Sequence, residues 1–261
     1  MSGIKDRVAV IGMGCSKFGE RWDSSSSDLI VEAAYEAFED AGIESKDVQA
    51  AWLGTVGSFR TGQPLAAALK LDYIPITRVE NACATATDAF RNACYAVAAG
   101  IYDIVLAVGV EKLKDSGFSG LAVAEPAGAD VNPPVPPPSQ FALAATRYFH
   151  EHGISYEDGK MTLAQIASKN HHNGTMSPKA HFQREVSVEQ VANAPMVAWP
   201  LGLFDCCGVS DGAAAAIITT PAIAKTFRDD YVLVKGLGLS VGAYGIMRND
   251  WDFTHFPETV R

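Results

Sequence analysis

A single cysteine stands where a predicted strand passes into a predicted helix, in the stretch VENACATATDAF at residues 79–90. The β-favouring run 76–79 stops at Glu80, and Cys83 follows among small residues. A thiol in the first turn of a helix lies close to unpaired N–H groups and to the positive end of the helix dipole, which lower its pKa and favour the thiolate. The same N–H groups could stabilise a developing oxyanion. This position therefore suits a nucleophile.

Cys83 also has a structural interpretation, since an isolated cysteine is most often a small, buried hydrophobic residue. The residues alone leave both interpretations open. Small neighbours such as Ala82 and Ala84 would let a ligand carbonyl approach the thiol. Cys94, in the same predicted helix, has no such position, and we expect it to pack in the core.

A nicotinamide site fits the sequence poorly. Gly12 and Gly14 follow the first predicted strand, but the dinucleotide-binding fingerprint needs a third glycine where Lys17 stands. We therefore interpret these glycines as a tight turn after a strand.

A metal site is not predicted either. The histidine pairs at 150/152 and 171/172 do not share one helical face, and the sequence contains no C-x-x-C. Cys206 and Cys207 are adjacent, a poor geometry for holding one ion. We expect the histidines at 171 and 172 to lie at a helix end, where a cation complements the dipole.

The composition is that of a globular protein: 261 residues, 48% hydrophobic and 20% charged. No apolar run is long enough for a membrane span, and no signal peptide is predicted. Five cysteines with irregular spacing argue against a disulfide framework and for the reducing cytoplasm. A net charge of −9 disfavours nucleic acid as a partner.

The predicted elements must position Cys83. Strands and helices alternate in the first part of the chain, which predicts a sheet of parallel strands covered by helices. The predicted strands are 7–13, 48–56, 76–79 and 102–110, and the predicted helices are about 29–41 (ended by Gly42), 63–71 and 84–100. A Gly, Ala and Pro-rich loop at 115–138 interrupts the alternation.

The second part of the chain is expected to be mainly helical. Helices are predicted over 139–152, over 163–171 with a stop at Gly174, and from Ser187, where Ser-Val-Glu-Gln is a capping box. Strands are predicted at 211–220, returning to the core sheet, and at 231–242. A further helix is expected to begin at Pro257.

Four segments together resemble the thiolase superfamily, in particular the sterol-carrier-protein type and archaeal-like thiolases. They are VAVIGMGCSKFG, ENACATATDAFRNACYAVAAGIYDIVLAVGVEK, KNHHNGTMSPKAHF and PLGLFDCCGVSDGAAAAIIT. The resemblance implies an α/β fold, the five-layered αβαβα thiolase fold of two similar halves with an inserted helical loop domain. It also implies acyl-CoA substrates and homo-dimers that often pair into tetramers.

The resemblance divides the chain into four parts. Residues 1–115 would form the N-terminal half with the nucleophile, 116–205 the loop domain, 206–230 the return strand, and 231–261 the start of a C-terminal half. That second half would be incomplete, so we expect residues 1–261 to need a C-terminal continuation in order to function.

The resemblance assigns Cys83 as the acyl-accepting cysteine of an acyl-CoA C-acyltransferase, with coenzyme A as co-substrate and no covalently bound cofactor. It places Gln140 and Phe141 where the loop domain meets the thioester end of the substrate, and Cys207 near the pantetheine arm. The activating histidine of the family, in a G-H-P segment, and its second cysteine are not found in this sequence.

The sequence departs from the family after the nucleophile, with Cys-Ala-Thr-Ala-Thr in place of C-A-S-G. Branched threonines change the pocket floor, so we expect a substrate bulkier than acetoacetyl-CoA. Some relatives of this kind require a small zinc-bearing OB-fold partner. Two alternatives stay open: a thiolase-like retro-aldolase that does not need Cys83 as nucleophile, and a non-catalytic thiolase-fold subunit.

Overall fold

The computed structural model describes residues 3–115, 136–242 and 252–260, which fall into two compact units. The first unit contains the described residues up to 115 together with 209–238. The second contains the remaining described residues. Each unit has buried apolar clusters of its own, so each can be treated as a packed body.

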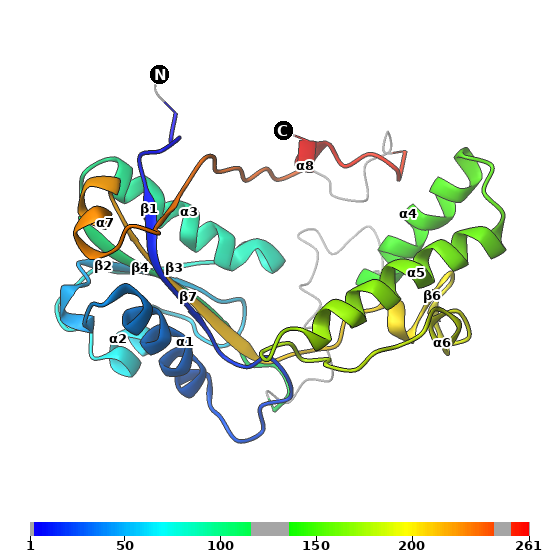
Figure 1. Ribbon diagram of the computed structural model, residues 1–261, viewed down its shortest axis with the longest axis horizontal. Coiled ribbons are helices and arrows are strands. Elements are labelled where there is room, and N and C mark those ends of the chain that lie inside the picture. Colours follow the sequence, from blue (N-terminus) through cyan, green and yellow to red (C-terminus); the bar gives the residue numbers. More distant parts are fainter. Residues whose placement is uncertain (1–2, 116–135, 243–251, 261) are drawn as a thin grey trace, which may run out of the picture. The chain divides into compact units, whose positions relative to one another are not determined.

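A six-stranded mixed sheet forms the centre of the first unit, in the order β3-β2-β4-β7-β1-β8 (Figure 1). The strands are β1 Ala9–Cys15, β2 Ala50–Gly54, β3 Ile76–Val79, β4 Ile104–Glu111, β7 Gly212–Thr219 and β8 Val232–Leu233. β2 is parallel to β3 and β4, whereas β7 is antiparallel to both β4 and β1.

The expectation of parallel strands is therefore confirmed for β2, β3 and β4, and β7 returns to the core sheet as predicted, in an antiparallel direction that the sequence did not specify. The register explains this direction, because Glu111 at the end of β4 pairs with Gly212 at the start of β7. The chain thus leaves the sheet and returns to it at the same edge. A strand that returns at this edge must run antiparallel to the one that left.

Helices cover both faces of the sheet, with α1 and α2 on one face and α3 on the other (Figure 1). Their bounds are α1 Ser26–Ala41, α2 Gln63–Leu69 and α3 Thr85–Ala98; α7 Pro221–Phe227 follows β7, and the short 3-10 turns are η1 Ser45–Asp47 and η2 Ala82–Ala84. Ser25 begins α1 in a capping box with Asp28, and Gly42 ends it in the left-handed region at φ 70°. The end at Gly42 follows the sequence prediction, whereas the helix begins at Ser26, ahead of the predicted start near residue 29.

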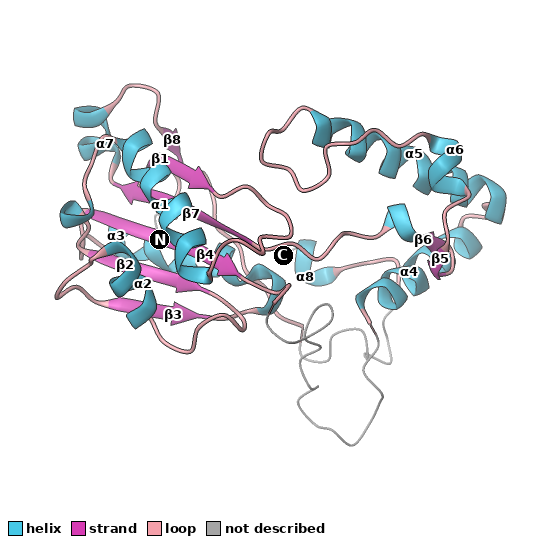
Figure 2. Ribbon diagram, turned by 90° about the horizontal axis from the view of Figure 1, so that it is seen from below, coloured by secondary structure: helices cyan, strands magenta, loops and turns pink. Residues whose placement is uncertain are grey.

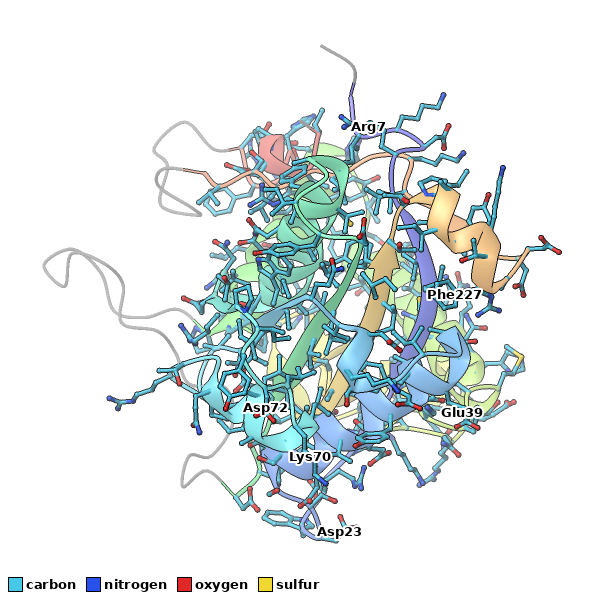
Figure 3. The ribbon with its side chains drawn as sticks, turned by 90° about the vertical axis from the view of Figure 1, so that its left-hand side faces the viewer. Arg7, Asp23, Glu39, Lys70, Asp72 and Phe227 are labelled. Atoms are coloured by element: carbon cyan, nitrogen blue, oxygen red, sulfur yellow. The ribbon has the colours of Figure 1, made fainter. Side chains whose placement is uncertain are left out.

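Arg7 ties the start of β1 to the far end of α3. This residue is labelled in Figure 3, and its guanidinium donates a hydrogen bond to the carbonyl of Ala98, the last residue of α3. A cation at the C-terminal end of a helix complements the helix dipole. The C-terminal end of α3 therefore has an anchor of its own, separate from the contacts of its N-terminal end, which Cys83 precedes.

The second unit is mainly helical (Figure 2). Its elements are α4 Pro137–Glu151, α5 Tyr156–Thr175, α6 Val188–Ala192, β5 Met196–Ala198, β6 Leu201–Gly202, η3 Leu203–Asp205 and α8 Pro257–Val260. Ser187 caps α6 in the predicted capping box, and the helix at Pro257 is present. Most of the predicted loop 115–138 lies outside the described residues.

The predicted helix 163–171 is too short, and Gly174 does not end it. α5 begins after Ser155, whose hydroxyl accepts a hydrogen bond from the Asp158 N–H, and it includes both Gly159 and Gly174. A Cβ at position 159 would come within 2.5 Å of the Phe149 ring. These glycines permit close packing instead of terminating the helix. Similarly, the predicted strand 231–242 is reduced to Val232–Leu233.

None of the helices within the described parts of the chain is both long and apolar enough to cross a membrane.

Candidate active site

The carboxyl ends of three parallel strands meet at one edge of the sheet in the first unit. In register there, Gly54 at the end of β2 lies between Val79 of β3 and Gly109 of β4. Ligands of α/β proteins bind preferentially at the carboxyl ends of strands. Cys83 follows β3 directly, so the fold places the candidate nucleophile at this edge.

A tight turn presents the Cys83 thiol. Ala82 adopts φ 47°, a left-handed conformation that residues other than glycine rarely adopt. The Glu80 carboxylate accepts a hydrogen bond from the Ala82 N–H at 2.6 Å. The Thr85 hydroxyl accepts from the Asn81 N–H at 2.8 Å and donates to the Ala82 carbonyl at 2.6 Å. The turn is thus held from both sides.

Cys83 precedes α3 instead of lying in its first turn, which corrects the sequence expectation. The residue belongs to η2, a single 3-10 turn, and its side chain is exposed. The Thr85 hydroxyl bonds account for the tighter turn, since they engage backbone groups of residues 81 and 82 just ahead of the helix. A left-handed non-glycine residue costs on the order of 1–3 kcal/mol, and such strain is concentrated at functional sites.

Two glycines let α3 approach the sheet beneath this turn. A Cβ on Gly109 would clash with the Ala86 Cβ, and a Cβ on Gly54 would lie 3.0 Å from the Ala86 Cα. The first turn of α3 therefore rests directly on the backbone of β2 and β4. This close packing determines how near the start of α3, and with it Cys83, lies to the ends of β2 and β4.

The loop after β2 is fixed at the same edge by two charged side chains. The Glu111 carboxylate accepts hydrogen bonds from the N–H groups of residues 56, 57 and 58 at 2.7 Å, 3.1 Å and 2.8 Å. The Arg78 guanidinium donates to the carbonyls of residues 55, 56 and 59. A rigid loop and a rigid turn thus lie at the ends of neighbouring strands.

Sequence reasoning missed the residues that shape this edge. Glu80 ends the predicted strand, and Asn81, Arg78, Gly109 and Glu111 are not among the predicted site residues. A charged residue at the last position of an apolar strand, as at 111, is the signal that could have indicated a loop anchor. The hydrogen-bond partners themselves are not visible in the sequence.

Cys83 and Cys207 are exposed, whereas Cys94 is buried and Cys15 and Cys206 are partly buried. Cys94 is fully buried, as predicted, and burial raises the pKa of its thiol to about 12. Burial, together with the nearby Asp205, also raises the pKa of Cys206. Cys207 is exposed.

The remaining predicted site residues belong to the second unit, whereas Cys83 belongs to the first. Gln140 and Phe141 are neighbours near the start of α4, with Phe141 61% exposed, and Cys207 follows η3. A cavity of about 390 Å³ lies beside them in the second unit, but neither Gln140 nor Phe141 lines it. Its lining consists of Ser139, Ala142, Leu143, Thr146, Ala198 and Trp199.

The described residues contain no group of three or more His, Cys, Asp or Glu side chains that could hold a metal ion. His171 and His172 lie near the end of α5, as predicted. His171 contacts the rings of Phe182 and Phe204, and the His172 Nδ1 lies 2.8 Å from a Glu185 carboxylate oxygen.

Comparison with known proteins identifies the family. The family described as thiolase, N-terminal domain, matches residues 8–222. The chain belongs to the thiolase family. An acetyl-CoA acetyltransferase of Methanothermobacter thermautotrophicus is 39% identical, with 97% of this chain and 67% of that protein covered. The benzoylsuccinyl-CoA thiolase subunit BbsB of Thauera aromatica is 33% identical, with 85% and 57% covered. The chain thus spans between 57% and 67% of the length of these two thiolase-family relatives.

Solved structures agree with this assignment at the level of fold. A structure titled Ltp2-ChsH2(DUF35) aldolase matches with a TM-score of 0.80 at 24% identity, covering 98% of this chain and 68% of that one. A monomeric SCP2-thiolase-like protein of Mycobacterium smegmatis matches with a TM-score of 0.74 at 19% identity, covering 98% and 55%. The prediction of a thiolase-type α/β fold, made from four sequence segments, is confirmed.

Proposed function

We propose that this thiolase-family chain supplies the acyl-accepting cysteine of an enzyme that cleaves a 3-oxoacyl-CoA with coenzyme A. The observation that carries the proposal is the exposed Cys83, held on a strained turn between the carboxyl end of β3 and the start of α3. The backbone N–H groups at the start of α3 carry partial positive charge, which would stabilise a thiolate or an oxyanion.

In this reaction the Cys83 thiolate attacks the 3-oxo carbon, forming a C–S bond. The bond between C2 and C3 then breaks, and its electron pair leaves with the CoA thioester as an enolate. A proton converts the enolate into acetyl-CoA or a 2-substituted equivalent. The thiol of coenzyme A, as thiolate, attacks the acyl-cysteine and releases a shortened acyl-CoA together with Cys83. The acyl-cysteine is itself a thioester, so its exchange with the thiol of coenzyme A is nearly isoenergetic.

We further propose that the substrate is bulkier than acetoacetyl-CoA. Thr85 and Ala86 stand where the family often has Ser-Gly, so both side chains are larger here, and the BbsB relative is named for benzoylsuccinyl-CoA. The name of the Methanothermobacter relative, at 39% identity, points to acetyl transfer instead. A panel of 3-oxoacyl-CoAs decides between them: equal kcat/KM on acetoacetyl-CoA and on every larger substrate would refute the bulky-substrate proposal.

The roles of Gln140, Phe141 and Cys207 near the thioester end and pantetheine arm of the substrate also remain proposals. Phe141 is the most exposed of the large apolar side chains on α4, which suits a side chain that meets a ligand. We likewise propose that the chain divides into an N-terminal half at 1–115, a loop domain at 116–205, a return strand at 206–230 and the start of a C-terminal half at 231–261.

Mass spectrometry of the intact protein after incubation with a 3-oxoacyl-CoA tests the function. We expect an acyl adduct on the peptide that contains Cys83, and loss of both adduct and thiolysis in Cys83→Ala. Full C–C cleavage by Cys83→Ala would favour the retro-aldolase instead. Binding of CoA esters without any turnover in the complete protein would favour the non-catalytic subunit.

We propose a cytoplasmic homo-dimer or tetramer, in keeping with the family. A small OB-fold accessory subunit is a further proposal, because the solved aldolase is itself titled as a complex with a DUF35 protein. Light scattering gives the molar mass of the purified protein alone and with a co-expressed candidate subunit. It therefore tests the oligomeric state and the accessory subunit. A monomer that is fully active without any added subunit would refute both proposals.

A further inference from the structure

Asp88 is a buried carboxylate in the first turn of α3, close in sequence to Cys83. Its side chain is only 8% exposed. Aspartate is almost never buried to this extent without a partner, because burying an unpaired charge is costly. Asp88 is the charged residue among the buried residues of α3, which are otherwise Thr85, Ala89, Ala93, Cys94 and Val97, so its burial calls for a physical reason.

The partners of Asp88 divide between its two carboxylate oxygens. Oδ1 accepts hydrogen bonds from Arg91 Nε at 2.8 Å, Arg91 NH2 at 2.6 Å and Asn92 Nδ2 at 2.9 Å. Oδ2 accepts one from Asn81 Nδ2 at 2.6 Å. The Oδ1 bonds stay within α3 and balance the negative charge. The Oδ2 bond leaves the helix and reaches back to the turn that carries Cys83.

Asn81 is the residue immediately before the left-handed Ala82. Its side chain is held by Asp88 and its N–H by the Thr85 hydroxyl, so two residues of α3 hold it at once. A return of Ala82 to negative φ would release backbone strain, so its neighbours must prevent this change. The Asn81–Asp88 bond opposes that relaxation, since it fixes the residue on which the turn pivots.

We propose that Asp88 is a positioning residue for Cys83, acting through Asn81 to hold the turn that presents the thiol to the start of α3. This rests on the proposed role of Cys83 as nucleophile. Asp88 does not touch the substrate. Its contribution is to hold the turn that carries the Cys83 side chain at the start of α3.

The test is a double-mutant cycle read out at Cys83. Alkylation of the Cys83 peptide by iodoacetamide is followed by mass spectrometry across a pH series in the full chain. The variants are Asn81→Ala, Asp88→Ala, both together, and Asp88→Asn. Asp28→Ala, which removes a first-turn carboxylate from the α1 capping box, is the matched control. Buried Cys94 serves as the unreactive internal reference.

We expect Asn81→Ala and Asp88→Ala each to slow Cys83 alkylation at neutral pH about tenfold, the effect of losing one charge-assisted hydrogen bond. The pH midpoint of alkylation should move upward in both. The double variant should be no slower than either single one, because both remove the same bond. Asp88→Asn should stay near wild type, since the Asn81 amide can rotate to accept from the new amide. Asp28→Ala should not change Cys83 alkylation.

Wild-type alkylation rates and pH midpoints in Asn81→Ala would overturn the proposal, whatever happens to thermal stability. Because Asn81 is only partly buried, this variant remains informative if Asp88→Ala does not fold. Incubation of the wild-type protein with acetoacetyl-CoA and larger 3-oxoacyl-CoAs separates the two proposals. If no acyl adduct forms on Cys83, the proposed function fails, whereas the alkylation cycle still judges the positioning role.

Discussion

At the scale of single residues, Asp211 shows how one buried charge holds the edge of the sheet where the chain leaves and returns. Its side chain is fully buried and accepts hydrogen bonds from Lys112 Nζ at 2.9 Å and from the N–H groups of residues 21, 113 and 114 at 3.0, 2.7 and 3.0 Å. Burial opposes the ionised form of Asp211, but these hydrogen bonds outweigh it and lower the pKa of the carboxyl.

Asp211→Asn should therefore destabilise the protein by about 3 kcal/mol at neutral pH, the lower end for breaking a buried ion pair, because Lys112 keeps Asp115 as a partner. A lowered carboxyl pKa stabilises the fold above the ordinary aspartate value of 3.8, and this contribution is lost as the pH falls through the folded-state pKa. Urea unfolding of both proteins between pH 7 and pH 3 measures the difference. A difference in unfolding free energy between wild type and Asp211→Asn that does not decrease on acidification would contradict this account.

At the scale of secondary-structure elements, the seating of α3 on the sheet decides where Cys83 lies. The contact uses Ala86 against Gly109 and Gly54, positions where a strand would ordinarily carry β-branched side chains. Glycine weakens a strand, so its presence at both positions is consistent with a close approach of the helix backbone.

Gly109→Ala should destabilise the protein by about 1–3 kcal/mol through overpacking and should displace the first turn of α3. Adding Ala86→Gly should recover part of the loss, less the roughly 0.5–1 kcal/mol cost of a helical glycine. Thermal unfolding measures the loss of stability in Gly109→Ala and its recovery in the double variant. Gly236→Ala is the matched control, since a Cβ there meets no atom within 4 Å. Equal losses at positions 109 and 236 would argue against the packing explanation.

At the scale of the whole molecule, the two units differ greatly in their cores. Two clusters covering both faces of the sheet form the core of the first unit. The buried cluster of the second unit consists of Ala164, Ala167, Val186 and Val191. Local stability follows the amount of buried apolar surface, so the helices of the second unit should open more easily than the strands of the first.

Hydrogen exchange of the native protein, followed by mass spectrometry, should show the strongest protection in β4 and β7. Amides in the middle of α4 and α5 should exchange at least about tenfold faster, equivalent to about 1.4 kcal/mol less opening free energy. Uniform protection across both units would show that they open together and would contradict the expectation of separate stability.

The sequence determined the features that depend on local chemistry. Residues 79–90, the end of a β-favouring run followed by polar and then small residues, placed a strand and the helix after it correctly, and Ser187 and Gly42 marked real helix ends. The burial of Cys94 was expected because this residue lies within the helix, away from its first turn. Four segments in the right order were enough to recognise the thiolase family, which the comparisons confirm.

The tertiary structure decided what depends on residues far apart in the chain. The antiparallel β7 follows from the pairing of Glu111 with Gly212, and no local pattern at 211–220 specifies that direction. Gly174, which looked like a helix stop, lies inside α5 because tertiary packing outweighs the intrinsic preference of glycine for helix ends. The backbone turn that presents Cys83 depends on the hydrogen bonds of Asn81 with Thr85 and Asp88. Hydrogen-bond geometry of this kind is decided only when the helix and the sheet edge pack together.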